Sequence, residues 1–324
     1  MALVFTAISN SLAALLLLAR WQADQRGLAR VRDVLRLEHV LVIALISIGL
    51  YGFGMSLNDL IDRRRDRQLA PQRPLPSGRV GVITAHVICV LLALVALVGG
   101  ILYSRWTGNP MSLLLVAWTG LLITFYDLAG KYLVGPGLLT LGLIRFFHAV
   151  VPAPDLPLLW HPLLLLNHVT ILSLIAYHWE EKRPPLTPAH WWGVLSGLAT
   201  VNVLSVALVW SRRTRVGLDP WTDALSIEPA LLIPLACVLG FVALAWYVRR
   251  SVRNSREAGQ TLMLYGLLWL IVYDVAFVAA FVGLVPALAL LILLPLAYAS
   301  VQLMRWWGRL ITLSQRPGFK RADA

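Results

Sequence analysis

The chain has 324 residues, of which 59% are hydrophobic and only 14% are charged, and its mean hydropathy is +0.74. Soluble domains are roughly 45–50% apolar and about 25% charged, so this composition excludes an ordinary soluble domain. The net charge of +12 at pH 7 would favour a nucleic-acid partner in a soluble protein. Here the arginines lie between apolar blocks without a basic and aromatic platform, which argues against nucleic acid and for a lipid bilayer as partner.

Ten apolar segments follow one another along the chain, and each is close to the ~20 residues that cross ~30 Å of hydrocarbon. They are residues 2–19, 38–57, 80–103, 111–127, 133–151, 161–178, 190–210, 229–248, 261–283 and 285–304. Only a short turn at 283–286 separates the last two. The pattern predicts an all-α, polytopic bundle of about nine or ten transmembrane helices, forming a single domain over residues 1–324.

The basic residues between these segments predict the orientation of the bundle, because Lys and Arg are enriched in cytoplasmic loops. Under strict alternation, 18 of them, including those of the basic C-terminal tail, lie on the side of loop 58–79, and 9 lie on the other side. We therefore expect loop 58–79 to be cytoplasmic. Five arginines within residues 20–36 oppose this orientation, and we interpret that stretch as an amphipathic helix lying at the membrane interface.

An acidic motif follows the second apolar segment directly and contains Asn58, Asp59, Asp62 and Asp66. On a helix with about 100° per residue, Asn58, Asp62 and Asp66 fall within about 80°, and Asp59 falls about 20° further round. Carboxylates this close repel one another, whereas Mg²⁺ prefers oxygen ligands and shares its shell with substrate phosphates and water. The pattern predicts Mg²⁺ ligands at these four positions; simple pairing with the arginines at 63–67 is the alternative.

Residues 72–79 contain two prolines and a glycine, which predicts a rigid loop rather than a helix. Arg73 and Arg79 of this loop are placed to bind phosphate oxygens if the neighbouring metal holds a diphosphate. Their alternative role is to orient the bundle, with no ligand. Two charged residues, Arg145 and Asp274, lie inside apolar segments, where a charge is costly and is functional or paired.

These motifs resemble those of the UbiA-type intramembrane prenyltransferases. Asn-Asp-x-x-Asp-x-x-x-Asp, followed by Arg-Pro-Leu-Pro-Ser-Gly-Arg, is similar to the first motif of that family. Further resemblance covers the family's first helix, the Tyr…Lys stretch after its fourth helix, and an Arg-Phe-x-Asn stretch of its fifth helix, in which His148 replaces the Asn; the matching residues are 4–10, 126–131 and 145–148.

The resemblance implies a helical bundle around a central cavity, in which Mg²⁺ on two acidic motifs holds a polyprenyl diphosphate. Loss of the diphosphate leaves an allylic cation, which an aromatic or other nucleophile captures. On this basis we expect Asp62, Asp66 and Glu180 to be catalytic. The residues expected to bind the diphosphate are Asn58, Arg73, Arg79, Lys131 and Arg145.

The second motif departs from the family pattern. Most members carry Asp-x-x-x-Asp after the sixth helix, whereas residues 177–183 read Tyr-His-Trp-Glu-Glu-Lys-Arg. Adjacent glutamates point about 100° apart on a helix, so only one of them faces the site. We expect Glu180 to complete the metal shell, and Glu181 to face lipid headgroups or to pair with Lys182 or Arg183.

The function that follows is Mg²⁺-dependent transfer of a prenyl group from a prenyl diphosphate donor to an aromatic or other small lipophilic acceptor, by an integral, multi-pass membrane enzyme. Two alternatives stay open. The incomplete second motif favours a non-catalytic transport or assembly protein on the same fold. A transferase that moves a phosphosugar onto a polyprenyl phosphate would carry a similar first motif.

Overall fold

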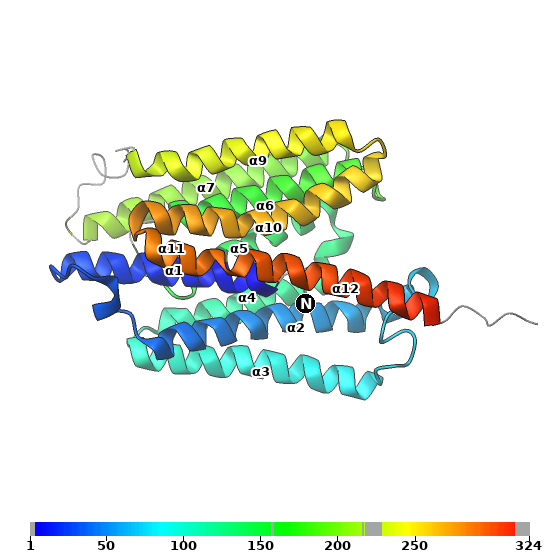
Figure 1. Cartoon of the computed structure of the whole chain (residues 1–324), viewed down its shortest axis with the longest axis horizontal. Helices are drawn as coiled ribbons and strands as arrows, with labels where there is room; N and C mark the ends of the chain where they lie inside the picture. Colours follow the sequence, from blue (N-terminus) through cyan, green and yellow to red (C-terminus); the bar gives the residue numbers. More distant parts are fainter. Residues whose placement is uncertain (1–3, 157–158, 216, 218–228, 315–324) are drawn as a thin grey trace, which may run out of the picture.

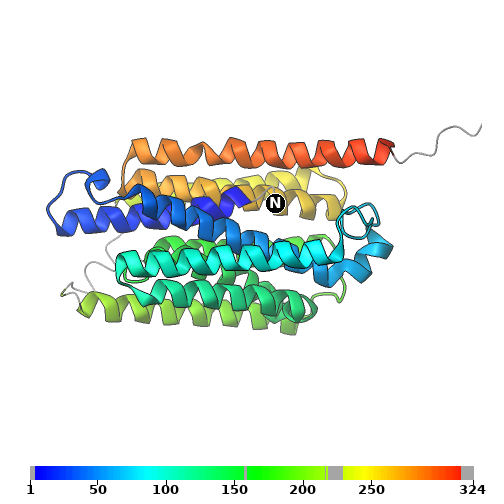
Figure 2. The same cartoon turned by 90° about the horizontal axis from the view of Figure 1, so that it is seen from below.

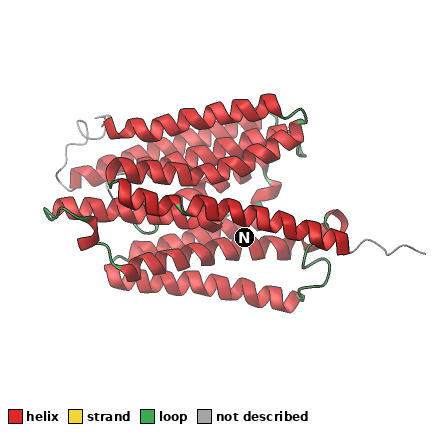
Figure 3. Ribbon diagram, viewed as in Figure 1, coloured by secondary structure: helices red, strands yellow, loops and turns green. Residues whose placement is uncertain are grey.

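The computed structural model describes residues 4–156, 159–215, 217 and 229–314. Within these ranges every regular element is a helix (Figures 1 and 3). The α-helices are α1 (Val4–Gln25), α2 (Leu37–Leu69), α3 (Val82–Thr107), α4 (Pro110–Leu128), α5 (Val134–Val150), α6 (Trp160–Trp179), α7 (Pro188–Arg215), α9 (Leu232–Ser251), α10 (Ser255–Phe281), α11 (Leu284–Leu291) and α12 (Leu293–Ser314), with short 3-10 turns η1 (Val31–Asp33), η2 (Gly130–Tyr132) and η3 (Pro229–Leu231).

The predicted transmembrane bundle is confirmed. Nine helices of the described ranges are long and apolar enough to cross a membrane, and α5 is a shorter apolar helix. The helices run roughly side by side along the long axis of the molecule, with α12 along one edge and α7 along the opposite edge in Figure 2. The tight turn between the last two segments is also confirmed, since Gly283 has a φ of +137° and separates α10 from α11.

Parts of the predicted ranges lie outside the described residues. The first predicted segment, 2–19, begins there, and so does most of the basic tail, from residue 315 onward. A single domain over 1–324 therefore stays a prediction.

Small residues set the packing of α2, the helix that carries the acidic motif. A Cβ added to Gly49 of α2 would lie 2.7 Å from the backbone nitrogen of Ala96 in α3. From the other side, a Cβ on Gly99 of α3 would lie 2.8 Å from Cγ1 of Ile46. In lipid, helices associate through such close backbone approach rather than through a hydrophobic driving force. This contact fixes α2 against α3 and thereby fixes the direction in which its last turns project.

The interpretation of residues 20–36 as an interfacial amphipathic helix is wrong. Residues up to Gln25 belong to α1, and the rest forms a loop whose only regular element among the described residues is η1. Three of its arginines have acidic neighbours: Arg20 pairs with Asp24 at 2.8 Å, Arg32 with Asp33 at 3.9 Å, and Arg36 with Glu38 at 3.6 Å. Short-range pairing within a loop, and a turn at Gly27 with φ +65°, replace the expected helix.

Candidate functional site

A polar cavity of about 700 Å³ lies where α2 and α6 end and α10 begins. Its wall joins residues from α2, η2, the turn after α6 and the first turn of α10. Five of these residues are cationic, namely Arg65, Lys131, Lys182, Arg183 and Arg256, and three are acidic, namely Asp62, Glu180 and Glu181. The alternation of spans predicted that these loops share one face of the bundle, and the cavity brings them together there.

An apolar chamber of about 300 Å³ continues from the polar cavity into the bundle. Its wall is built by α1, α2, α4, α5, α6 and α10 and includes Leu50, Gly54, Met55, Ile123, Leu141, Ile144, Val169 and Leu267. The two spaces share Asn58, Tyr126, Leu141, Ser173 and Met263. The central cavity that the family resemblance implied is therefore present, polar at the end of the acidic motif and apolar within the bundle.

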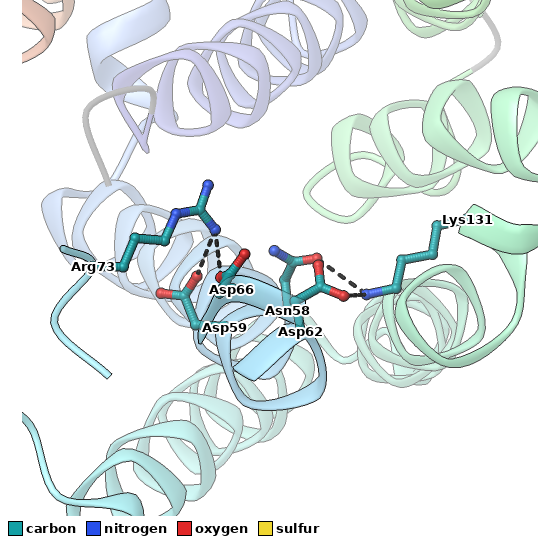
Figure 4. A network of polar contacts seen from close by, with 6 residues as sticks. All are labelled: Asn58, Asp59, Asp62, Asp66, Arg73 and Lys131. Carbon is teal, nitrogen blue, oxygen red and sulfur yellow. Dashed lines mark hydrogen bonds and ion pairs between the residues drawn. The ribbon is translucent and has the colours of Figure 1, made fainter. Parts of the chain in front are cut away.

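The acidic motif is helical, as predicted, because α2 continues to Leu69, well beyond the predicted segment 38–57. Its carboxylates do not converge on one point but pair with two different cations (Figure 4). Lys131 Nζ lies 2.7 Å from Asp62 Oδ1, whereas Arg73 Nη1 lies 2.7 Å from Asp66 Oδ2 and 4.0 Å from Asp59 Oδ1. Asp62 faces the polar cavity, and the Asp59 and Asp66 pair faces the loop after α2.

Asn58 connects the acidic motif to a carboxylate that the sequence reasoning missed. In one orientation of the Asn58 amide, its Oδ1 accepts from Lys131 Nζ at 3.5 Å. With its nitrogen turned toward the carboxylates, it donates to Asp127 Oδ1 at 3.1 Å and to Asp62 Oδ2 at 3.2 Å. Asp127 is only 3% exposed and lines the apolar chamber. The signal for it in the sequence was an acidic residue at the end of an apolar segment, four positions before Lys131.

The position of Lys131 depends on close backbone packing. Lys131 lies in η2, and a Cβ on Gly137 of α5 would lie 2.1 Å from the carbonyl oxygen of Gly130. Only glycine allows α5 to begin this close to η2. The packing places the Lys131 side chain over α2, where it is 10% exposed.

The loop after α2 is held by its own polar contacts. Arg79 donates to the Gln72 carbonyl and, at 3.0 Å, to Ser77 Oγ, which in turn donates to the Pro74 carbonyl at 3.1 Å. The predicted rigid loop is thus present. Arg73 and Arg79 are both outside the wall of the polar cavity, Arg73 on the motif carboxylates and Arg79 within the loop, and their binding of diphosphate stays a prediction.

The second acidic stretch differs from the expectation in its ion pair. Glu180 is the C-cap of α6, with a side chain 12% exposed, and its Oε2 lies 3.2 Å from Lys182 Nζ. We expected Glu181 to face lipid headgroups or to pair with Lys182 or Arg183. Glu181 is exposed and has a φ of +51°, and Lys182 pairs with Glu180. The turn at Glu181 reverses the chain, so Lys182 folds back on Glu180. Both glutamates line the polar cavity.

The acidic motif of α2 fits a metal ion only in part. Its oxygen donors suit Mg²⁺, which keeps several waters and is completed by substrate phosphates. Among the described residues, however, no three His, Cys, Asp or Glu side chains form a group that could hold an ion. The donor set therefore fits an ion that a bound diphosphate completes, and Glu180 does not join Asp62 in a common metal shell in this structure.

Arg145 lines the apolar chamber, not the polar cavity. It donates to Asn10 Oδ1 at 3.3 Å and to Thr6 Oγ1 at 3.1 Å, both in α1. Asn10 in turn donates to Asp274 Oδ2 at 2.8 Å. The charge of Arg145, which lies inside an apolar segment, is thus hydrogen-bonded within a buried polar network. A direct contact of Arg145 with the diphosphate stays a prediction.

Two histidines of α6, His161 and His168, are buried in this part of the bundle. His168 bonds the Gly266 carbonyl at 2.9 Å, and His161 Nε2 lies 2.6 Å from Asp274 Oδ1. His161 and Asp274 are 1% and 0% exposed. Asp274 is therefore a buried partner of two side chains.

Comparison with known proteins gives a family match over part of the chain. Residues 27–153 match the model of the UbiA prenyltransferase family. The UbiA resemblance is confirmed over this stretch. It contains the acidic motif of α2, the loop after it, Asp127, Lys131 and Arg145. No curated protein matches the chain by sequence.

Two solved structures resemble the whole fold. One, described as digeranylgeranylglyceryl phosphate synthase in membranes, has a TM-score of 0.55 at 17% identity, covering 86% of this chain and 94% of its own. The other, a UbiA homolog from Aeropyrum pernix K1, has a TM-score of 0.46 at 19% identity, covering 83% of this chain and 97% of its own. At this identity, the first likeness shows a shared fold alone, which extends to helices after the family match.

Proposed function

We propose that the chain is a membrane prenyltransferase that transfers a prenyl group from a prenyl diphosphate to a small lipophilic acceptor. The observation that carries this proposal is the continuity of the two spaces at Asn58 and Tyr126. A cationic, polar cavity suits a diphosphate, and an apolar chamber that opens from it suits the attached hydrocarbon. The match of residues 27–153 to the UbiA family supports the same reading.

The side chains of the polar cavity bind and orient the diphosphate. Lys131 is held beside Asp62 by η2, and Arg65 lies on the same wall. Asn58, Asp59, Asp62 and Asp66 would hold Mg²⁺ together with the diphosphate, and the ion supplies positive charge that makes the diphosphate a better leaving group.

The reaction breaks the bond between C1 of the prenyl group and the diphosphate oxygen, and the electron pair leaves with the diphosphate. The apolar chamber excludes water from the allylic cation that remains. Tyr126 lines both spaces, so its ring can face that cation. A nucleophilic atom of the acceptor then bonds to C1 and releases its proton, for which Asp127 is a carboxylate on the chamber wall.

The test is the substitution Asp62→Asn, which keeps the shape of the side chain and removes its charge. We expect transfer to fall about 10²–10³-fold, the loss typical of one preorganised electrostatic contact. Asp33→Asn is the matched control, because Asp33 lies at the opposite end of the bundle and pairs only loosely with Arg32 at 3.9 Å. Diphosphate release and prenylated product are measured with purified protein and several acceptors.

The same assay separates the alternatives. If Asp62→Asn releases diphosphate at the same rate as the unsubstituted chain, the acidic motif has no role in catalysis. Absence of release from the unsubstituted chain with every acceptor and donor chain length would favour the non-catalytic transport or assembly protein. A phosphosugar on the product, identified by mass spectrometry, would favour the phosphosugar transferase.

A further inference from the structure

We propose that the α6 side of the polar cavity binds the diphosphate through Lys182, Arg183 and Arg256, so that cationic side chains take the place of a second metal ion and the site works with one. This inference rests on the proposed function. It concerns the half of the site in which the chain departs from the family's acidic pattern.

The first support is the charge of the cavity wall. Five cations face three carboxylates there. Two of the carboxylates are already paired, Asp62 with Lys131 at 2.7 Å and Glu180 with Lys182 at 3.2 Å. Neither Arg183 nor Arg256 forms an ion pair with any of the described residues. The wall thus keeps positive charge that a polyanion would neutralise.

The second support is the ion pair that Glu180 forms. Lys182 lies against Glu180 Oε2. On the α2 side Asp62 also pairs with a lysine, but there Asn58 and Asp127 lie beside it as further oxygen donors. The glutamate that follows Glu180 is exposed and turned by its positive φ. Together with Asp62, these carboxylates form no group that could hold an ion within the described part of the chain. The α6 half therefore suits an anion better than a cation.

The third support is the contact that brings α10 to this wall. A Cβ on Gly259 would lie 2.7 Å from Glu180 Cγ and 3.1 Å from the Ala176 carbonyl oxygen. Arg256 lies about one turn before Gly259, in the first turn of α10, whose start is set by Asn254 Oδ1 accepting from the Arg256 amide at 2.9 Å. This packing places Arg256 on the wall of the same cavity as the turn at 180–183, which is 73 or more residues away in sequence.

The decisive experiment is a binding measurement without metal. The full chain in detergent is titrated in EDTA with geranylgeranyl thiolodiphosphate, which resists cleavage, and with inorganic diphosphate. We expect binding of the thiolodiphosphate in EDTA. Arg256→Gln and Lys182→Gln should each weaken it about tenfold, the usual effect of one charged hydrogen bond. Arg253→Gln is the matched control, because Arg253 is exposed and off the cavity wall, and it should bind like the unsubstituted chain.

Glu180→Gln distinguishes this inference from the metal-ligand role that the sequence suggested. If Lys182 and its neighbours bind the diphosphate, removing the Glu180 charge frees Lys182, and binding in EDTA stays equal or becomes tighter. Mn²⁺ counted by electron paramagnetic resonance in the presence of the thiolodiphosphate should reach one ion per chain, both in the unsubstituted chain and in Glu180→Gln.

The outcomes are separable. Two Mn²⁺ ions per chain, with one lost in Glu180→Gln, would overturn the inference, as would equal affinities of Arg256→Gln, Lys182→Gln and the control. Binding that requires Mg²⁺ would overturn it while leaving the prenyltransferase proposal intact. No binding of thiolodiphosphate with or without Mg²⁺ would overturn both. Lys182→Arg, which keeps the charge, should restore binding if Lys182→Gln loses it, and helicity by circular dichroism confirms that each variant is folded.

Discussion

At the scale of single residues, the chain places its costly buried charges in a network that crosses four helices. Asp274 of α10 accepts from Asn10 of α1 at 2.8 Å and lies 2.6 Å from His161 of α6, and Asn10 also accepts from Arg145 of α5. In the membrane interior, no water is available to hydrogen-bond a polar group that lacks a protein partner. The network therefore links the helices of the chamber wall, and its value depends on each member keeping its partner.

We predict that Asp274→Ala destabilises the protein by about 2–4 kcal/mol, because it leaves Asn10 and His161 buried without their shared partner. Asp274→Asn keeps an oxygen acceptor and the side-chain volume, so it should cost clearly less. The measurement is unfolding in detergent, followed by tryptophan fluorescence. Equal midpoints for the two variants would show that the Asp274 contacts contribute little.

At the scale of elements, the site depends on where helices touch through glycine. Gly259 lets α10 approach the end of α6, and Gly137 lets α5 approach η2. In both places a cation that we propose to bind the diphosphate, Arg256 or Lys131, lies within a few residues of the contact. A substitution that changes only this backbone packing should therefore alter the polar cavity, even though no charged residue is substituted.

We predict that Gly259→Ala weakens binding of a prenyl thiolodiphosphate several-fold and lowers stability by about 1–3 kcal/mol, the usual cost of overpacking. The new Cβ meets the Ala176 backbone at 3.1 Å, so α10 must move and takes Arg256 with it. Gly193→Ala in α7 is the control, because a Cβ there meets nothing within 4 Å. Unchanged affinity in Gly259→Ala would mean that the position of Arg256 is not set by this contact.

At the scale of the whole molecule, the polar cavity opens at the face that carries most of the basic loops. Loop residues at the opposite end are also rich in arginine, but three of those arginines have acidic neighbours within 4.0 Å. Positive charge on short loops sets the orientation in the membrane. We therefore keep the expectation that the cavity faces the cytoplasm.

This orientation is tested with two single cysteines in a chain that lacks Cys89 and Cys237. Gln68 is exposed at the end of α2, and Arg30 is exposed in the loop between α1 and α2. In intact spheroplasts, a membrane-impermeant maleimide should label Arg30→Cys, and it should label Gln68→Cys only after lysis. The reverse pattern would place the polar cavity on the outside.

The sequence alone determined the features that depend on neighbouring positions. The length of each apolar block predicted a helical membrane bundle, and the spacing of Asn58, Asp62 and Asp66 predicted a helix that presents oxygen ligands. The helices of both predictions are present because helix periodicity and membrane thickness act on short stretches of chain. Metal binding by these oxygens stays a prediction. The loop after α2 was also predicted, because its prolines, glycine and arginines lie within one short stretch of chain.

Only the tertiary structure decided which charges meet. Lys131 reaches Asp62 from 69 positions away, and His161 reaches Asp274 from 113 positions away. Such contacts depend on how each helix is rotated about its axis and how closely it approaches its neighbours. Glycine contacts between distant segments contribute to both quantities, as at Gly259. No local pattern records them, which is why Asp127 was missed and why the pairing of Lys182 with Glu180 was not predicted.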